Sequence, residues 1–378
     1  MKALVTDAHL REVVAGIRGL GRGGIPVVAL ASGPSAAGVW SRYVVSRSFV
    51  PESAVHSHDL PDTIAAIARR RRPIVLYPGA EETLNALVEA TGPPPAVRLP
   101  YGCLDALRLL RDKKRLAELA NEAGLAVPAT VTSGYASDLP LRHVDYPCVV
   151  KPIRSGSALS TTRVVHSAGD LERVLEPLPP TEPLLVQERY AGSLMAVALV
   201  IDASGHLLAR FQQESHGVWP PEAGVSSTAV SVAPDERLIG RAAEVLRVAG
   251  YSGLAQLQFI RGERGPLLID VNPRFYGSLP LALASGVNLP AIWHGSVAFG
   301  ERSRVGDYRV GVTYRWLRAD VAAAIQGSPR TVLRLAPRPR VGAVWAPDDP
   351  LPSLVSTAGT LARAMQRRLP SRSGRRGA

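Results

Sequence analysis

Residues 254–275 read LAQLQFIRGERGPLLIDVNPRF, two apolar runs on either side of a charged turn that contains two glycines. This pattern predicts an antiparallel β-hairpin. With the turn at the middle of the segment, Gln258 faces Asp270 and Gln256 faces Asn272 across the two strands. Because side chains alternate along a strand, the hairpin brings a carboxylate and several amide oxygens to one face.

This polar face has two interpretations. Asp270, with the amides of Gln258 and Asn272, supplies the oxygen ligands that Mg²⁺ takes together with water and phosphate. Arg274 is expected to point the same way and to offer a planar donor fork to a phosphoryl or carboxyl group. The half-solvated outer face of an antiparallel sheet explains the same geometry equally well. Pro273 removes a ladder donor and marks a strand end, and this favours the functional interpretation.

The first hundred residues alternate short apolar runs with amphipathic helical segments. This alternation predicts βαβ units, and hence a parallel sheet with helices on both faces. The sequence GLGRGG at Gly19–Gly24 matches the glycine spacing of dinucleotide-binding loops. It follows a predicted helix and precedes a strand, the reverse of what such a loop needs, so we predict a helix end and turn there.

Lysine is scarce in this chain, which contains only Lys2, Lys113, Lys114 and Lys151 among 44 basic residues. Arginine has replaced lysine wherever a positive charge is enough, so the remaining lysines are candidates for a role that needs an ammonium. Lys113 opens a helix that Asp112 can cap, where a cation is slightly unfavourable. Lys151 ends an apolar strand, where a buried charge needs a partner such as phosphate.

In this order and spacing, these motifs resemble the ATP-grasp superfamily, of the carbamoyl-phosphate-synthetase-like or carboxylate–amine ligase type. The resemblance implies an α/β chain in which two α+β lobes clasp ATP after a Rossmann-like parallel domain. It implies that ATP is contacted by Lys113, Lys151, the loop Ser155, Gly156 and Ser157, and a hinge of Gln187, Glu188 and Tyr190. It implies that Mg²⁺ or Mn²⁺ is held by Gln258, Asp270 and Asn272, and that the catalytic residues are Arg274 and Lys151.

The same resemblance divides the chain into five parts. They are a Rossmann-like domain (1–100), a small ATP-grasp lobe (101–185), a C-terminal lobe with the Mg–ATP site (186–300), a C-terminal extension (301–360) and a disordered basic tail (361–378). The tail is predicted from its six arginines and its lack of acidic residues. It holds half of the formal net charge of +12.

The implied function is an ATP-dependent ligase that activates a carboxylate as an acyl phosphate for attack by an amine. Two alternatives stay open, a bicarbonate-activating carboxylase or carbamoyl-phosphate-type enzyme and a non-catalytic ATP-binding module. The second is suggested by departures from the family pattern, a loop with only Gly156 and the apolar pair Leu194 and Met195 beside the hinge. Glu214, His216 and Ser226 either line a changed substrate pocket or belong to a surface loop.

Composition limits the remaining classes. A basic nucleic-acid-binding protein fits the net charge, but few aromatics and no nucleic-acid motif argue against it. No apolar run approaches the length of a membrane-spanning helix, and Asp7 and His9 interrupt the start where a signal peptide would be apolar. Two cysteines cannot form a disulfide framework. We therefore expect a cytoplasmic protein with small-molecule carboxylate and amine partners, and a homodimer is left open.

Overall fold

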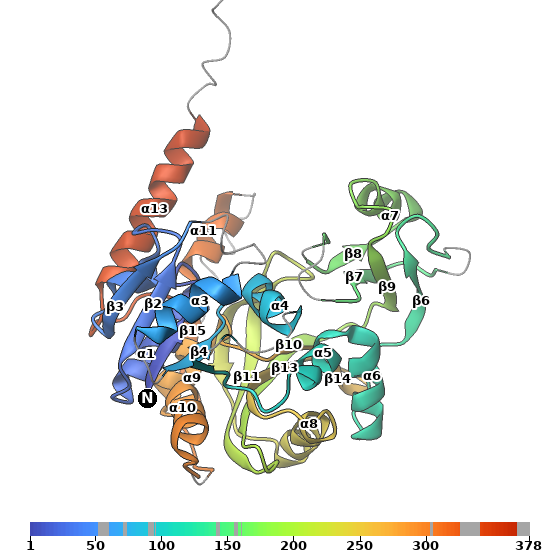
Figure 1. Ribbon diagram of the computed structural model, residues 1–378. Coiled ribbons are helices and arrows are strands. Elements are labelled where there is room, and N and C mark those ends of the chain that lie inside the picture. Colours follow the sequence, from blue (N-terminus) through green and yellow to red (C-terminus); the bar gives the residue numbers. More distant parts are fainter. Residues whose placement is uncertain are drawn as a thin grey trace, which may run out of the picture.

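The structure is a computed structural model of the 378-residue chain. It describes residues 1–51, 60–70, 74–89, 94, 96–140, 144–154, 158–159, 161–302, 305–325 and 341–368, with the side chains of 324–325 and 361–368 left out. The described residues form a five-stranded, a four-stranded and a seven-stranded sheet, each associated with helices (Figure 1).

The five-stranded sheet is parallel and has the strand order β3-β2-β1-β4-β5. Its elements are β1 (Lys2–Val5), α1 (Arg11–Arg22), β2 (Val27–Ala31), η1 (Ala37–Trp40), β3 (Val44–Phe49), α3 (Leu60–Arg69), β4 (Ile74–Tyr77), α4 (Glu81–Glu89) and β5 (Val97–Arg98). Gly23 caps α1 and Gly24 has a φ of 75°, which confirms a helix end and turn at Gly19–Gly24. Strands β2 and β4 flank β1, so the chain leaves the central strand in both directions, and a crevice forms at the carboxyl ends of these strands.

The four-stranded sheet has the order β6-β9-β7-β8 and is antiparallel. Its elements are β6 (Thr130–Tyr135), β7 (Cys148–Pro152), β8 (Arg163–Val165), α7 (Ala168–Leu175) and β9 (Pro183–Glu188). Buried side chains such as Val150 and Leu171 give this sheet a core of its own. Figure 1 shows it to the side of the other two sheets, as a separate lobe.

The seven-stranded sheet has the order β14-β13-β10-β11-β12-β15-β16. Its elements are β10 (Ser193–Ile201), β11 (Leu207–Trp219), β12 (Val225–Ser231), α8 (Glu236–Val248), β13 (Gly253–Gly262), β14 (Gly265–Asn272), α9 (Leu279–Ser285), α10 (Leu289–Phe299), β15 (Thr313–Arg315), α11 (Leu317–Ile325) and β16 (Val341–Gly342). The two predicted cross-strand pairs are confirmed, because Gln258 pairs with Asp270 and Gln256 pairs with Asn272. Nearer the turn the register is shifted by one residue, since Phe259 pairs with Leu268 and Gly262 with Gly265.

Helices α5 (Leu104–Arg111) and α6 (Lys113–Glu122) link the sheets. Both contact β14, and α6 also contacts α8, so this part of the predicted small lobe lies on the seven-stranded sheet. The Asp112 carboxylate accepts hydrogen bonds from the backbone N–H groups of Lys114 and Arg115, which confirms the predicted cap of α6. Strands β15 and β16 of the predicted C-terminal extension join the large sheet. The domain limits themselves stay predictions.

The C-terminal helix corrects one expectation. Helix α13 (Leu351–Arg368) includes the first eight residues of the segment predicted to be a disordered tail. The disordered tail was predicted from its arginines, and that prediction overlooked the good helix formers alanine, methionine and glutamine between residues 362 and 366. Helix α13 contacts η1 and extends away from the body (Figure 1). Residues 369–378 lie outside the described part of the chain.

The N-terminal sheet and the seven-stranded sheet share one apolar core. At their junction, Gly16 of α1 lies against the ring of Phe275, where a Cβ would come within 2.5 Å of the ring carbon Cδ2. The guanidinium of Arg11 stacks 3.5 Å above the ring of Trp316. This close approach fixes the N-terminal domain directly beside the end of β14.

A membrane-spanning helix is absent from the described residues, since none of their helices is both long and apolar enough. The cytoplasmic location stays a prediction.

Candidate functional site

Lys113 and Asp270 approach each other from a helix and a strand that are far apart in sequence. Lys113 is the first residue of α6 and Asp270 lies near the end of β14, and the Nζ–Oδ1 distance is 3.4 Å. The Lys113 side chain is only 9% exposed, whereas that of Asp270 is 31% exposed. The backbone N–H of Lys113 donates to the carbonyl of Ile153, which ties the start of α6 to the end of β7. Three elements, α6, β7 and β14, therefore bring Lys113 and Asp270 together.

Lys151 is the second lysine at this site. It lies in β7, is 5% exposed, and its Nζ donates a hydrogen bond to the carbonyl of Ile269 at 3.2 Å. Burial and, to a smaller extent, the charge of Lys113 lower the pKa of Lys151, Asp270 partly opposes both, and the resulting pKa is about 8. An ammonium has three donors, and among the described residues Lys151 uses one. The remaining donors suit an anionic oxygen.

The candidate metal ligands lie together as the hairpin predicts. Gln258 and Asp270 are cross-strand partners, and Asn272 is two residues further along the same face of β14. All three are partly exposed. Among the described residues there is no group of three or more histidine, cysteine or acidic side chains, so a metal here would depend on amide oxygens. One carboxylate and two amides fit Mg²⁺ that keeps waters and phosphate oxygens as its other ligands.

Arg274 has partners that the hairpin pattern did not predict. Its Nε forms an ion pair with Glu81 at 3.0 Å, and its Nη1 lies 3.9 Å from Glu12 and donates to the carbonyl of Phe275 at 3.0 Å. Burial alone would lower the pKa of Arg274, but the charges of Glu81, Glu12 and Asp270 outweigh it and raise the pKa above its ordinary value. The hairpin pattern could not reveal this, because both glutamates belong to the N-terminal domain.

The predicted hinge residues have partners within the protein. Gln187 donates to the carbonyl of Pro128 at 3.2 Å. Glu188 accepts a hydrogen bond from Arg264 at 2.7 Å, and the Tyr190 hydroxyl accepts one from the Arg264 backbone at 2.6 Å. These side chains join the end of β9 to the β13–β14 turn, and nucleotide contact at the hinge stays a prediction.

The predicted phosphate loop cannot be placed, because Ser155, Gly156 and Ser157 lie outside the described residues.

The residues of the predicted changed substrate pocket lie on two neighbouring strands, β11 and β12. Glu214 forms an ion pair with Arg261 at 2.8 Å, and the Ser226 hydroxyl contacts that of Ser215. His216 is exposed on β11. All three residues lie in paired strands, Glu214 and His216 in β11 and Ser226 in β12, so the surface-loop interpretation is wrong. Their place in a substrate pocket stays a prediction.

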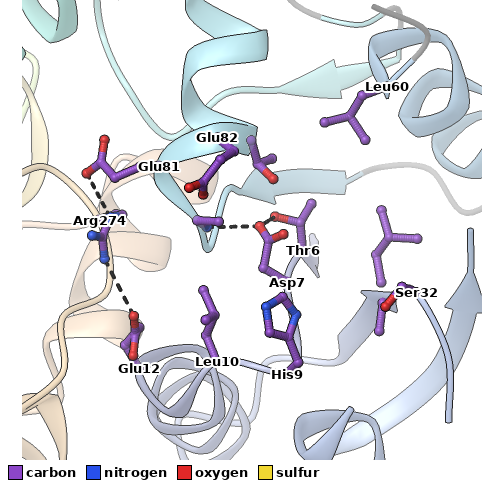
Figure 2. A pocket seen from close by; sticks show the side chains of 14 residues that line it. Thr6, Asp7, His9, Leu10, Glu12, Ser32, Leu60, Glu81, Glu82 and Arg274 are labelled. Carbon is purple, nitrogen blue, oxygen red and sulfur yellow. Dashed lines mark hydrogen bonds and ion pairs between the residues drawn. The ribbon is translucent and has the colours of Figure 1, made fainter. Parts of the chain in front are cut away.

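A cavity of about 390 Å³ at the N-terminal sheet was missed by the sequence reasoning (Figure 2). It lies at the carboxyl ends of β1, β2 and β4, and Arg274 reaches it from the hairpin. Its lining residues are Thr6, Asp7, His9, Leu10, Glu12, Leu30, Ala31, Ser32, Leu60, Ala80, Glu81, Glu82, Thr83 and Arg274. One signal could have found it, because Asp7 follows the first predicted strand of a parallel sheet and Glu81 and Glu82 come within a few residues of the end of the fourth.

Asp7 shows how this cavity is built. Its backbone is left-handed, with a φ of 56°, and its Oδ2 accepts hydrogen bonds from the N–H groups of Gly79 at 3.2 Å and Ala80 at 2.9 Å. A Cβ on Gly79 would lie 2.7 Å from the carbonyl oxygen of Thr6, so glycine is needed for this approach. The carboxylate thus joins β1 to the loop before α4 (Figure 2).

Comparison with known proteins bears on the family of this chain. Residues 181–319 match the family model described as ATP-grasp in the biosynthetic pathway with Ter operon. The vancomycin B-type resistance protein VanB of Enterococcus faecalis is 28% identical over 237 residues, 57% of this chain and 67% of that protein. The D-alanine–D-alanine ligase of Corynebacterium aurimucosum is 27% identical over 54% of this chain and 61% of the ligase.

Two further comparisons bear on the fold. The carbamoyl phosphate synthase large chain of Myxococcus xanthus is 26% identical over 61% of this chain, and the matched part is 22% of that large chain. The biotin carboxylase domain of the Hydrogenobacter thermophilus 2-oxoglutarate carboxylase, solved as a dimer with MgADP, ADP and bicarbonate, superposes with a TM-score of 0.62. It is 16% identical, and the superposition covers 82% of this chain and 73% of that one. These comparisons confirm the predicted fold.

Proposed function

Because the chain belongs to the ATP-grasp superfamily, we propose that it is an ATP-dependent ligase that joins a carboxylate to an amine. A carboxylate oxygen attacks the γ-phosphorus of ATP, ADP leaves, and an acyl phosphate forms. The amine nitrogen then attacks the acyl carbon, inorganic phosphate leaves, and the nitrogen loses a proton as the amide forms. Both substrates are small molecules.

The roles follow from the charges. Lys113 and Lys151 neutralise and position the phosphates, which is the main requirement of phosphoryl transfer. Gln258, Asp270 and Asn272 would hold Mg²⁺, which supplies further charge neutralisation to the phosphate oxygens. Arg274, held between Asp270 and the two N-terminal glutamates, orients the carboxylate end of the reaction. No side-chain nucleophile is needed.

One observation carries this proposal. Two nearly buried ammonium groups, from α6 and β7, converge on the segment Ile269–Asp270 of β14. Two adjacent buried cations repel each other, and one carboxylate cannot neutralise both of them together with a metal ion. A polyanion such as the phosphate chain of ATP resolves this imbalance.

The bicarbonate-activating alternative shares the first half of the chemistry. The similarity to a carbamoyl phosphate synthase large chain is the observation that favours it. It differs from the ligase in a measurable way, because ATP hydrolysis would then depend on bicarbonate and on no other acid. The non-catalytic alternative is favoured by the partners that already occupy the hinge side chains.

The test is a screen for ADP release over pairs of carboxylic acids and amines, with hydroxylamine added to trap an acyl phosphate. We expect release that depends on one acid, with a trapped hydroxamate and no AMP. Asp270→Asn should lower turnover by at least about 100-fold, because it removes the only carboxylate of the proposed metal set. Glu263→Gln, an exposed change in the turn of the same hairpin, is the matched control. AMP as the product, or full activity of Asp270→Asn, would refute the proposal.

A further inference from the structure

We propose that the N-terminal cavity binds a small, singly charged amine with an apolar body, and that this amine is the nitrogen substrate of the ligase. Its role in the reaction rests on the proposed function, but its binding does not. The argument uses the charge of the lining, an unpartnered buried hydroxyl, and the position of Arg274 (Figure 2).

The cavity has an excess of negative charge. Asp7, Glu12, Glu81 and Glu82 contribute four carboxylates to its lining, and Arg274 is the one arginine or lysine there. Glu81 and Glu12 are already neutralised. Glu81 pairs with Arg274 and also with Arg111, which donates two hydrogen bonds to its Oε2. Glu12 lies 3.8 Å from Arg11 and 3.9 Å from Arg274.

Two carboxylates are left over. Glu82 is exposed at the start of α4 and has no ion-pair partner among the described residues. Asp7 directs its Oδ2 to backbone N–H groups, and its Oδ1 has no hydrogen-bond partner among those residues. An anionic ligand would be repelled by both groups, and a cation would be attracted.

Thr83 supplies the independent sign of a ligand. It lines the cavity, its side chain is completely buried, and its Oγ1 has no hydrogen-bond partner in the described part of the chain. A buried hydroxyl without a partner is unfavourable, so an unpaired group in the wall of a cavity is best explained by a ligand that pairs with it. An ammonium has three donors and can donate one hydrogen bond each to Thr83, Asp7 and Glu82.

The rest of the lining indicates the polarity and size of the part of the ligand beyond its ammonium. Leu10, Leu30, Ala31 and Leu60 are apolar, and the volume of about 390 Å³ is within the range of small-molecule sites. The lining thus accepts a short apolar chain beside the ammonium. Arg274 borders the cavity and follows the proposed metal ligand Asn272 by two residues, so it links the cavity to the end of the hairpin that carries the proposed metal site.

The experiment measures binding of n-butylamine to the full chain, by thermal shift and by ligand-observed NMR. The matched probes are 1-butanol, which has no charge, and butyrate, which has the opposite charge. We expect stabilisation by the amine alone. Glu82→Gln should weaken amine binding about fivefold or more, because it removes an ionic contact. Glu89→Gln, an exposed change at the other end of α4, should leave binding unchanged.

Thr83→Val provides a second signature. It removes the unpaired hydroxyl while keeping the shape, so the free protein should melt at a higher temperature and bind the amine more weakly. Equal binding of 1-butanol, preferential binding of butyrate, absence of amine binding, or equal effects of the Glu82 and Glu89 changes would each overturn the inference.

The inference and the proposed function can fail separately. Asp270→Asn should abolish turnover and leave butylamine binding intact. Acid-dependent ADP release without amine binding would refute only this inference, whereas amine binding without any ADP release would refute only the ligase.

Discussion

The carboxylate of Glu81 lies 3.0 Å from the Nε of Arg274 and joins the N-terminal domain to the last residue of the motif that ends the hairpin. Burial on its own would raise the pKa of Glu81, but the charges and hydrogen bonds of Arg274 and Arg111 keep that pKa below its ordinary value. The pair therefore stays ionised, and it connects the acidic cavity to the face that carries Asp270.

Replacing Arg274 with lysine tests this connection. One ammonium cannot maintain both the ion pair with Glu81 and the hydrogen bond to the Phe275 carbonyl, since lysine lacks the planar fork. We expect a loss of about 1–3 kcal/mol in the free energy of unfolding and at least about tenfold slower ADP release. Denaturant titration and the ADP assay measure the two effects. Arg237→Lys, on the exposed surface of α8, should change neither.

The neighbouring lysines at the start of α6 form a natural control pair. Lys113 faces Asp270 and is nearly buried, whereas Lys114 is exposed. Lys113→Met should lower turnover by about 100-fold and weaken nucleotide binding, because one phosphate-neutralising charge is lost. Lys114→Met should stay within about twofold of the parent, as expected for a solvated charge. Equal effects of the two changes would contradict the assignment of Lys113.

Nucleotide binding should depend on pH through Lys151. Its pKa in the free protein is about 8, and a bound phosphate raises that pKa, so binding above pH 8 takes up a proton. Affinity for MgADP should be constant below pH 8 and should fall at higher pH, by at most about tenfold per unit. Calorimetry at pH 7, 8.5 and 9.5 in two buffers of different ionisation enthalpy measures both the affinity and the proton uptake. Lys151→Met should bind more weakly and lose the dependence, and a dependence that survives this change would have another source.

A buried ion pair between the C-terminal segment and the N-terminal domain should contribute to the stability of the fold. Asp349 is 1% exposed and accepts hydrogen bonds from Arg18 Nε at 2.9 Å and from the Ser41 hydroxyl at 2.7 Å. Asp349→Ala leaves the guanidinium of Arg18 buried without its partner, so we expect a loss of about 3–5 kcal/mol. Equilibrium unfolding measures it. Asp307→Ala, which removes an almost fully exposed carboxylate, should cost less than about 1 kcal/mol.

Local patterns predicted much of the fold. The alternation of strands and helices predicted the parallel sheet, and the pairing of Gln258 with Asp270 was predicted correctly. The Asp112 cap of α6 was also readable. In each case the information lies within a few residues of the element concerned, because hydrogen-bond capping and side-chain alternation are local effects. The one-residue register shift between Gln258 and Phe259 was not predicted.

The number of charged residues predicted order and disorder less well. Arginines near the C-terminus predicted a disordered tail from residue 361, yet helix α13 continues to Arg368. Helix propensity and packing against η1 act on the backbone whether or not the surface is highly charged.

The sequence by itself determined which residues could carry the chemistry. It singled out Lys113 and Lys151 by their scarcity and placed Asp270 in a polar strand face. Only the tertiary structure decided that these groups meet, because their elements belong to different parts of the chain. It also turned Arg274 toward Glu81 and formed the acidic cavity from the ends of three strands. Such contacts depend on how whole domains pack, and no local pattern encodes the distance between residues about two hundred positions apart.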